Sequence, residues 1–397
     1  MSFGRDVVII GGCGHVGLPL GIALADSNLN VSLYDINQAS VDRVNAGVMP
    51  FREEGADEML RRVVDGGLLT ATSDGTVVSS AEILILVVGT PVDDHLNPEP
   101  LKVLSAVEDL GPSLVDGQLL VLRSTLYPGV TALVEQLVGK LGVDVDVCFC
   151  PERIAEGHAL TELYELPQIV SGRTARAEER ADKLFRHLTD KIVFLSPEEA
   201  ELAKLFVNTW RYIRFAIANQ LYMISNDFGV DFERIRTALK QDYPRAADMP
   251  GPGFAAGPCL LKDTMQLAAF NNNNFVLGHA SMMINEGLPN YLVTRLERRF
   301  DLGQMTVGLL GMAFKAGSDD IRDSLSYKLK RILKIKARQV LCTDPHVTVD
   351  PDLTPLDEVL AQADLLVVCA PHREYAGLQP AVPVIDMWNC FGQGVRV

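Results

Sequence analysis

The chain has 397 residues, of which 48% are hydrophobic and 22% charged, a globular composition that excludes an intrinsically disordered protein. Its length suits two or three domains, because single hydrophobic cores stop growing at smaller sizes. Its formal net charge of -15 argues against nonspecific binding of nucleic acid, which needs basic surface to neutralise phosphates.

The first part of the chain alternates strands and helices. Residues 7–12 (VVIIGG) predict a strand, 15–27 a helix and 31–35 (VSLYD) a second strand, which together form a βαβ unit. Further strands are predicted in ILILVVGTP, LLVLRST and VCFCPER, as expected for a parallel sheet with crossover helices. We place this first domain at 1–195.

A glycine pattern connects the first predicted strand to the first helix. Gly12, Gly14 and Gly17 form GxGxxG, which permits a tight turn, close approach of a pyrophosphate and tight helix packing. Asp35 ends the second strand, where a carboxylate can bind ribose hydroxyls and repel a 2′-phosphate. The pattern therefore predicts NAD as cofactor. The alternative, a glycine turn without a cofactor, is disfavoured by the surrounding βαβ unit.

A long helix is predicted over 196–231, with Ser196 as N-cap, Glu199 at the third position and Gly229 as its stop. Its apolar residues lie on several faces, so we expect an interdomain spine that also contributes to a homodimer interface. Lys204 and Asn208 lie four residues apart on it, where a cation and an amide can stabilise a developing alkoxide. The alternative is a solvated lysine on an ordinary helix.

A glycine and proline loop, PGPGFAAGPCLLKD, follows within the central domain, which we place at 196–300. It presents Cys259 just before an apolar pair and the charged residues Lys262 and Asp263. Cationic neighbours favour a nucleophilic thiolate, whereas a core cysteine normally sits within a regular apolar pattern.

The last domain, placed at 301–397, is predicted to contain strands in TVGLLGMAF, VLCTDP, LLVVCAP and VPVIDMW. Gly308 and Gly311 do not complete GxGxxG, so a degenerate nucleotide fold for another ligand is favoured over a second dinucleotide site. The predicted fold is therefore α/β, with two Rossmann-like doubly wound domains joined by a long central helix and a helical middle region.

Location and metal content are predicted from what the sequence lacks. Its apolar runs are far shorter than a bilayer span, and its start shows no signal-peptide pattern, so we expect a cytoplasmic protein without a membrane partner. Seven cysteines without CxxC favour reduced thiols, most of them in the core. The seven histidines show no spacing such as HExxH, so no metal site is predicted.

Seven motifs occur in a fixed order: the GxGxxG turn, VGTPVDD, RSTLYPGVT, CPERIAEG, ELAKLFVN, GPCLLKD and GMAFKAGSDDIRDS. On these motifs the chain resembles, from end to end, the nucleotide-sugar 6-dehydrogenases, the group that contains UDP-glucose and UDP-N-acetylmannosamine dehydrogenases. The resemblance implies a double oxidation at C6 of the sugar, with Cys259 as nucleophile. The aldehyde forms a thiohemiacetal, the second oxidation gives a thioester, and water releases the uronate.

The resemblance also implies roles for residues around the nucleophile. Lys204 and Asn208 match the family's oxyanion-stabilising pair, while Thr125 and Asp263 match residues that position a water for proton transfer. Glu152 matches a carboxylate linked to thioester hydrolysis. The simpler alternatives are an N-cap for Thr125 and surface salt bridges for Asp263 and Glu152.

Ligand contacts and assembly are implied in the same way. Thr90 of VGTPVDD is assigned to the NAD site, and Gly257, Lys315 and Arg322 are assigned to the UDP-sugar. Arg245 matches the region from which an arginine reaches the neighbouring subunit's site, which implies a homodimer. A surface charge is the alternative for Arg245.

One departure bears on the substrate. The family's paired glycines before the cysteine are Ala256 and Gly257 here, and the added methyl restricts φ at Ala256. The substrate is therefore left open between a UDP-N-acetylhexosamine (ManNAc or GlcNAc) and UDP-glucose, although CPERIAEG is closer to the acetylhexosamine type.

Two other functions remain as alternatives. A single-step NAD-dependent hydroxyacid dehydrogenase also places Lys and Asn four residues apart on a helix, but it has no use for Cys259. An NAD-dependent sensor or scaffold without turnover is disfavoured by the combination of acid, base and thiol.

Overall fold

The structure, a computed structural model, describes residues 3–93 and 95–397. Residues 1 and 2 of the predicted first domain, and Asp94, the last residue of VGTPVDD, lie outside the described residues.

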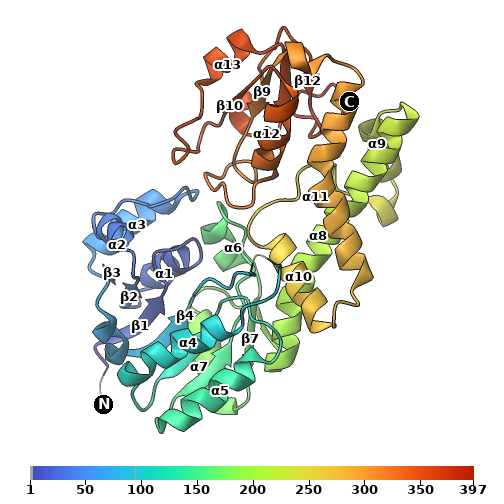
Figure 1. The fold of residues 1–397 in the computed structure, drawn as a ribbon. Helices are drawn as coiled ribbons and strands as arrows, with labels where there is room; N and C mark the ends of the chain where they lie inside the picture. Colours follow the sequence, from blue (N-terminus) through green and yellow to red (C-terminus); the bar gives the residue numbers. More distant parts are fainter. Residues whose placement is uncertain (1–2, 94) are drawn as a thin grey trace. The chain divides into compact units, whose positions relative to one another are not determined.

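The chain divides into two compact units, Met1–Phe206 and Val207–Val397. The boundary falls within one long helix, α8 (Pro197–Phe228), and Figure 1 shows a separate sheet in each unit. The finer division stays a prediction, with domains at 1–195, 196–300 and 301–397.

The first unit is built on an eight-stranded sheet. Its order is β3 (Leu69–Thr72), β2 (Val31–Tyr34), β1 (Arg5–Ile10), β4 (Ala81–Leu86), β5 (Leu119–Leu122), β6 (Asp146–Phe149), β7 (Gln168–Gly172) and β8 (Ile192–Phe194). Neighbouring strands are parallel except β6 and β7, which are antiparallel. All strands predicted for this part are present. The sequence patterns do not predict β3, β7 and β8, because these are short and two of them carry polar residues.

Helices cover both faces of this sheet. Successive β1 residues point to opposite faces, so Val7 and Ile9 join one hydrophobic core while Val8 and Ile10 join another. These two cores confirm the predicted doubly wound arrangement (Figure 1). The helices are α1 (Gly17–Asp26), α2 (Gln38–Asn45), α3 (Ala56–Asp65), α4 (Leu101–Leu110), α5 (Val130–Leu141), α6 (Ala159–Glu165) and α7 (Ala175–Phe185).

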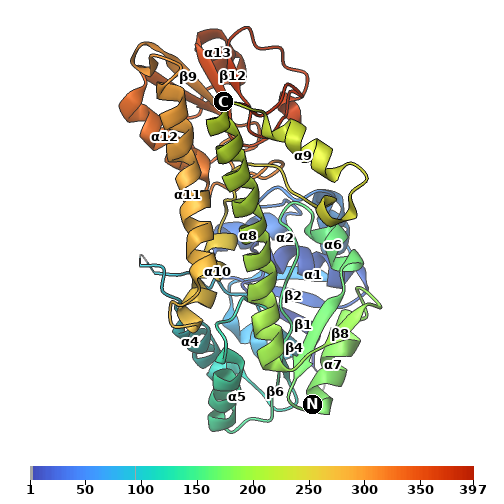
Figure 2. The same cartoon turned by 90° about the vertical axis from the view of Figure 1, so that its right-hand side faces the viewer.

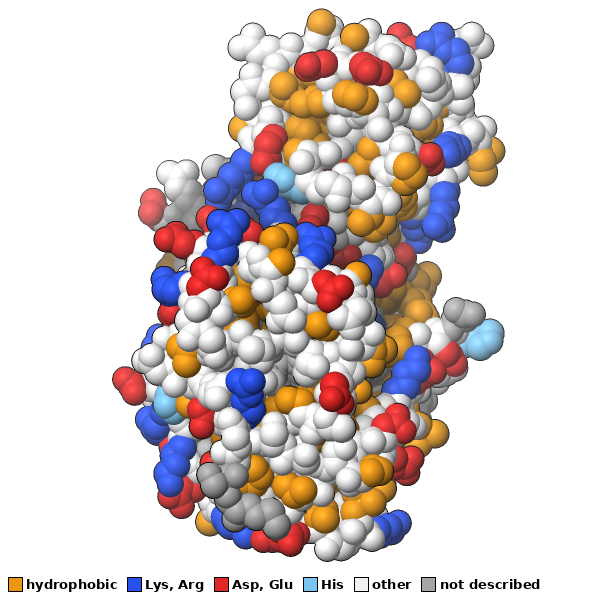
Figure 3. Space-filling view, turned by 90° about the vertical axis from the view of Figure 1, so that its left-hand side faces the viewer, with side chains coloured by type: hydrophobic (Ala, Val, Ile, Leu, Met, Phe, Trp, Pro, Cys, Tyr) orange, Lys and Arg blue, Asp and Glu red, His pale blue; other side chains and the backbone are white. Residues whose placement is uncertain are grey.

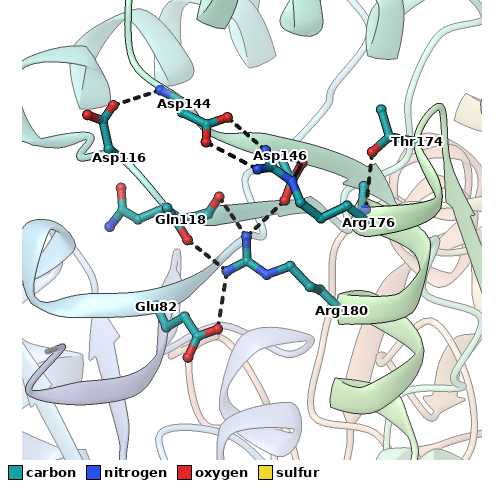
Figure 4. A network of polar contacts seen from close by, with 10 residues as sticks. Glu82, Asp116, Gln118, Asp144, Asp146, Thr174, Arg176 and Arg180 are labelled. Carbon is teal, nitrogen blue, oxygen red and sulfur yellow. Dashed lines mark hydrogen bonds and ion pairs between the residues drawn. The ribbon is translucent and has the colours of Figure 1, made fainter. Parts of the chain in front are cut away.

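A network of polar contacts closes the amino-terminal edge of this sheet (Figure 4). The buried Asp146, which begins β6, accepts hydrogen bonds at 2.9 Å from both Arg176 and Arg180 of α7. Arg176 also contacts Asp144, and Arg180 donates to the carbonyl of Gln118 at 3.2 Å. Ligands of such sheets bind at the opposite, carboxyl-terminal edge, so we assign the network to stability.

We expect Arg180→Ala to lower the free energy of unfolding by about 2 kcal/mol, because a buried carboxylate loses a charged hydrogen-bond donor. Arg186→Ala is the matched control, since Arg186 pairs with Asp182 at the surface and its loss should cost less than about 1 kcal/mol. Urea-induced unfolding measures both. Equal losses for the two variants would contradict the assigned role of the network.

The second unit carries a four-stranded parallel sheet. Its order is β10 (Gln339–Thr343), β9 (Thr306–Leu310), β11 (Leu365–Val368) and β12 (Val384–Ile385). All four predicted strands of the last part are present, and the second Rossmann-like sheet is confirmed. The helices are α9 (Phe232–Lys240), α10 (Leu260–Phe270), α11 (Val276–Glu297), α12 (Leu325–Lys336) and α13 (Leu356–Gln362).

The long helix α8 begins and ends as predicted. Ser196 Oγ accepts the N–H of Glu199 at 3.4 Å, and Glu199 Oε2 accepts the N–H of Ser196 at 2.8 Å, which is a capping box. Gly229, with φ +86°, follows its last residue. Within the second unit α8 runs beside α11 (Figure 2), where the Tyr291 hydroxyl donates to the carbonyl of Met223 at 3.0 Å.

Among the described residues, no helix combines the length and the apolar character needed to cross a membrane. On the face drawn in Figure 3, acidic and basic side chains both occur, with hydrophobic ones between them. An anionic ligand of this acidic protein must therefore meet local groups of cations.

Candidate functional site

The predicted glycine turn lies at the carboxyl end of β1. Gly12 and Gly17 are required by packing, because a Cβ on them would lie 2.7 Å from the carbonyl oxygen of Ile9 and 2.6 Å from that of Gly11, respectively. A Cβ on Gly14 would meet no protein atom closer than 3.8 Å. Its missing side chain leaves room where a pyrophosphate would approach the start of α1, so the turn fits a dinucleotide.

Asp35 follows β2 directly, as predicted for a ribose-binding carboxylate. Its Oδ2 accepts the N–H of Cys13 in the glycine turn at 2.9 Å, and its Oδ1 accepts the N–H of Asn37 at 3.0 Å. A carboxylate offers about four lone-pair sites, so acceptors remain for ribose hydroxyls. Its charge beside the turn opposes a 2′-phosphate. Thr90, the other predicted cofactor residue, is half-buried in the loop after β4.

A buried ion pair joins the RSTLYPGVT and CPERIAEG motifs. Arg123 donates to Oε2 of Glu152, and their side chains are 0% and 8% exposed. The other oxygen of Glu152 accepts the N–H of Arg153 at 2.6 Å and of Ile154 at 2.9 Å. The surface-salt-bridge alternative for Glu152 is therefore wrong, because its carboxylate is buried and held from both sides.

The loop that carries Thr125 is held by a residue that the sequence did not reveal. Thr125 is half-buried and does not cap α5, because Gly129, with φ +97°, has that position. Glu201 of α8 accepts the N–H of Gly129 at 2.6 Å and of Thr131 at 2.8 Å. The N-cap alternative for Thr125 is wrong, and Glu201 ties its loop to the helical turn before Lys204. A glutamate on a helix ordinarily indicates a solvated face, so no pattern singled it out.

Lys204 and Asn208 lie one turn apart on α8, and both are buried. The alternative of a solvated Lys204 is therefore wrong. Asn208 donates its side-chain amide to Oδ2 of Asp263 at 2.6 Å, and Lys262 Nζ lies 2.5 Å from the other oxygen. Asp263 is fully buried, so it is no surface salt bridge either. Within the second unit, Asn208 is thus joined directly to the helix that follows Cys259.

Of the seven cysteines, all of them among the described residues, only Cys259 is exposed. It occupies the N-cap position of α10, where the positive end of the helix dipole stabilises a thiolate. Burial raises the thiol pKa of the other six: Cys13 and Cys150 to about 12, Cys342 to about 11, and Cys148, Cys369 and Cys390 also upward. Cys259 is accordingly the one thiol placed to act as a nucleophile.

The loop before Cys259 is fixed at Gly253 by a buried amide. Asn219 of α8 donates to the carbonyl of Gly253 at 3.0 Å and accepts its N–H at 2.9 Å. The Asn219 amide also donates to Asn285 of α11 at 2.9 Å. A Cβ on Gly253 would lie 2.3 Å from the ring of Trp388. Asn219 was not predicted from the sequence, because a single amide in a long helix matches no motif.

The same loop is fixed again at Gly257. This residue has φ +96°, and a Cβ on it would lie 2.5 Å from the ring of Phe314. Its N–H donates to the carbonyl of Asp323 at 3.3 Å. Ala256, in contrast, has no positive φ, and its methyl packs against the hydrophobic core of the second unit. The departure from paired glycines thus falls on the residue that needs no left-handed backbone.

The basic residues that are predicted to bind the nucleotide lie on two segments of the second unit. Lys315 and Arg322 belong to the loop that also carries Phe314, and Arg322 Nε donates to Asp320 at 2.7 Å. Arg245 lies in a separate single helical turn and is exposed. Lys315 and Arg322 therefore share one loop with the residue that packs on Gly257, and Arg245 does not.

The second glycine turn, after β9, is held by a carboxylate of the protein. Gly311 has φ +95°. Oδ2 of Asp344, which follows β10, accepts the N–H of Met312 at 2.7 Å and of Ala313 at 2.9 Å. Because GxGxxG is also incomplete here, the arrangement favours the predicted degenerate nucleotide fold over a second dinucleotide site.

One group in the second unit has the spacing of metal ligands. His346, His372 and Glu374 each offer a ligand atom, and these atoms lie within 4.8 Å of one another. Both ring nitrogens of His372 are engaged, however, one by the N–H of Gly317 and the other by Asp344. We therefore assign no metal to this group.

Models of known families match three consecutive segments of the chain. They are described as the NAD binding domain, the central domain and the UDP binding domain of the UDP-glucose/GDP-mannose dehydrogenase family, and they match residues 6–189, 198–286 and 308–393.

Individual relatives match nearly the whole chain. The UDP-N-acetyl-D-mannosamine dehydrogenase of Pyrococcus horikoshii is 30% identical over 97% of this chain and 92% of its own. An NDP-N-acetyl-D-galactosaminuronic acid dehydrogenase of Ralstonia nicotianae is 30% identical over 94% and 92%. Among solved structures, a UDP-glucose dehydrogenase from Pyrobaculum islandicum superposes with a TM-score of 0.89 at 26% identity, covering 96% of this chain and 94% of that one.

Proposed function

Because the chain belongs to the UDP-glucose/GDP-mannose dehydrogenase family, we propose that it oxidises C6 of a UDP-hexose twice and releases the uronate. NAD, when bound in the first unit, accepts one hydride in each oxidation. The observation that carries the proposal is Cys259, the exposed thiol at the start of α10, whose helix is joined to Asn208 through Asp263.

In the first oxidation, the C6 alcohol loses a hydride and a proton and becomes an aldehyde. Lys204 and the Asn208 amide stabilise the negative charge that develops on the oxygen. Thr125 and Asp263 hold a water that carries the proton away. Cys259 then adds to the aldehyde through its sulfur, and the carbonyl oxygen is protonated, which gives a thiohemiacetal.

In the second oxidation, the thiohemiacetal loses a hydride and its hydroxyl proton and becomes a thioester on Cys259. Water adds to the thioester carbonyl, the C–S bond breaks, and the thiol is restored as the uronate leaves. Glu152 assists this hydrolysis by orienting the turn of CPER, where two backbone N–H groups and Arg123 hold its carboxylate. Lys204 stabilises the oxyanion in this step as well.

The substrate is assigned as a UDP-sugar, with a UDP-N-acetylhexosamine preferred over UDP-glucose. Relatives named for N-acetylated sugars, together with the CPERIAEG sequence, support this order. Lys315 and Arg322 bind the diphosphate with charge-assisted hydrogen bonds, and Gly257 lets the backbone approach the sugar.

The proposal is tested by offering the purified protein UDP-N-acetylmannosamine, UDP-N-acetylglucosamine, UDP-glucose, UDP-galactose and GDP-mannose with NAD. NADH absorbance and mass spectrometry of the product are recorded for each sugar. A uronate from one of the UDP-sugars is expected. NAD reduction by none of the five would refute the proposal and favour a sensor or scaffold.

We further propose that the enzyme is a homodimer that associates through α8. Trp210, Ile217, Ile224 and Phe228 are exposed, and their spacing places them within about 40° of one another around the helix axis. Such an apolar stripe on a long helix suits burial against a second copy. The exposed Arg245 is then free to reach the partner's nucleotide.

We expect Ile224→Asp to convert the dimer into monomers at micromolar concentration, because a buried unpaired carboxylate costs about 2 kcal/mol or more at such an interface. Ile335→Asp is the matched control, since Ile335 is exposed on another helix, α12. Sedimentation velocity gives the mass of each. A monomeric wild-type protein, or an unchanged mass of the Ile224 variant, would contradict the proposed interface.

We place the enzyme in the cytoplasm. The nucleophile requires a reduced thiol, and reducing compartments maintain free cysteines of the kind found here.

A further inference from the structure

The loop that carries Lys315 and Arg322 is tied at two points to one buried carboxylate. Asp344 Oδ2 accepts the backbone N–H groups at the start of the loop, as described above. The same oxygen lies 3.1 Å from Nε2 of His372. The other ring nitrogen, Nδ1, accepts the N–H of Gly317 in the exposed part of the loop at 3.1 Å. His372 therefore links the loop's exposed part to Asp344.

The contacts of His372 fix its proton. Because Nδ1 accepts from Gly317, the proton is on Nε2 and is donated to Asp344. Burial alone would raise the pKa of Asp344, but the bond from His372 and the N–H groups of Ala313 and His346 hold it well below its usual range. Both side chains of the pair are 0% exposed, so water cannot replace the bond between them.

We propose that His372 is a positioning residue for the nucleotide. By holding Gly317, it fixes the backbone between Lys315 and Arg322, so that both cations are preorganised for a diphosphate. The inference rests on the proposed function, since it takes a uridine diphosphate as the ligand of this loop. His372 acts through the backbone of the loop and is no catalytic residue.

Three substitutions separate the two hydrogen bonds of the imidazole. His372→Asn keeps an acceptor where Nδ1 stands, because both atoms are bonded to Cγ, and it loses the donor at Nε2. His372→Gln keeps a donor near Nε2 and loses the acceptor for Gly317. His372→Phe keeps a ring against His346 and Tyr375, whose centroids lie 5.0 and 5.7 Å away, and loses both bonds.

The Kd of UDP is measured by titration calorimetry on the full-length protein. It is expected to rise about five- to tenfold in the Gln and Phe variants, the effect of one backbone hydrogen bond, and less than about twofold in the Asn variant. The KM for the sugar nucleotide should rise in parallel, with kcat unchanged. The Kd of NAD, bound by the other unit, is expected to stay unchanged.

The outcomes separate this inference from the function on which it rests. A wild-type protein that binds no UDP would refute the proposed nucleotide site itself. If the wild-type protein binds UDP and the Gln and Phe variants bind it with the wild-type Kd, the role of His372 alone would be overturned. A larger loss in the Asn than in the Gln variant would overturn it as well, because the bond to Asp344 would then be the one that matters. The comparison of Asn with Gln stands even if the Phe variant fails to fold.

Discussion

Replacing Cys259 by serine is expected to abolish formation of the uronate while leaving NAD binding intact. A hydroxyl is a weaker nucleophile than a thiolate, and serine gives an ester in place of a thioester, so the second oxidation and the hydrolysis both slow. Uronate production should fall on the order of 10³-fold or more, the scale expected when a nucleophile that acts as part of a unit is lost. Mass spectrometry of the product and titration with NAD measure the two properties.

Cys390→Ser is the matched control, because Cys390 is half-buried and its thiol pKa is raised. It should keep nearly full activity. If Cys259→Ser also kept nearly full turnover, the thiol would have no part in the chemistry. A single-step hydroxyacid dehydrogenase would then be the better account of Lys204 and Asn208.

Replacing Gly257 by alanine is expected to lower kcat/KM by about 10²-fold, the cost of displacing a reacting group by about 1 Å. Its backbone conformation costs an L-residue about 1–2 kcal/mol. The new Cβ would also lie 2.5 Å from the ring of Phe314, so the loop must shift and carry Cys259 with it. Steady-state kinetics with the accepted UDP-sugar measure the effect.

Gly251→Ala tests the same loop without the strain. Gly251 has no left-handed φ, and the nearest atom to its Cβ would be 3.9 Å away, on Arg236. We expect this variant to retain activity within about twofold, because alanine fits there in ordinary contact. Equal losses at Gly251 and Gly257 would mean that the loop tolerates no change at all, and Phe314 would not explain the effect.

Local signals in the sequence predicted much of the fold. The apolar run of β1, the glycine turn and the Ser196 and Glu199 capping box each lie within a few residues, so their patterns are readable without tertiary context. The antiparallel β7 and the three-residue β8 were not predicted. Short strands have little pattern of their own, and whether they pair depends on tertiary context.

The residues of the candidate site that act through their own chemistry could be predicted from the sequence. The residues that hold them in place through hydrogen bonds were harder to predict. Cys259 lies in a glycine and proline loop, a pattern that predicts an exposed position. Asp35 lies at the end of a predicted strand, a pattern that predicts a ribose-binding carboxylate. The polar residues that hold the site residues in place were not predicted, because this role depends on their burial in the folded protein. His372, between Pro371 and Arg373, would be expected at the surface, yet it is fully buried against Asp344.

The stoichiometry of NADH to sugar tests the double oxidation at Cys259 most directly. A limiting amount of the accepted UDP-sugar is converted completely with excess NAD, and NADH is measured by absorbance while the product is identified by mass spectrometry. Two NADH per sugar, with uronate as product and no free aldehyde, is the expected result. One NADH per sugar, with an aldehyde or ketone accumulating in solution, would contradict a covalent thiohemiacetal and thioester.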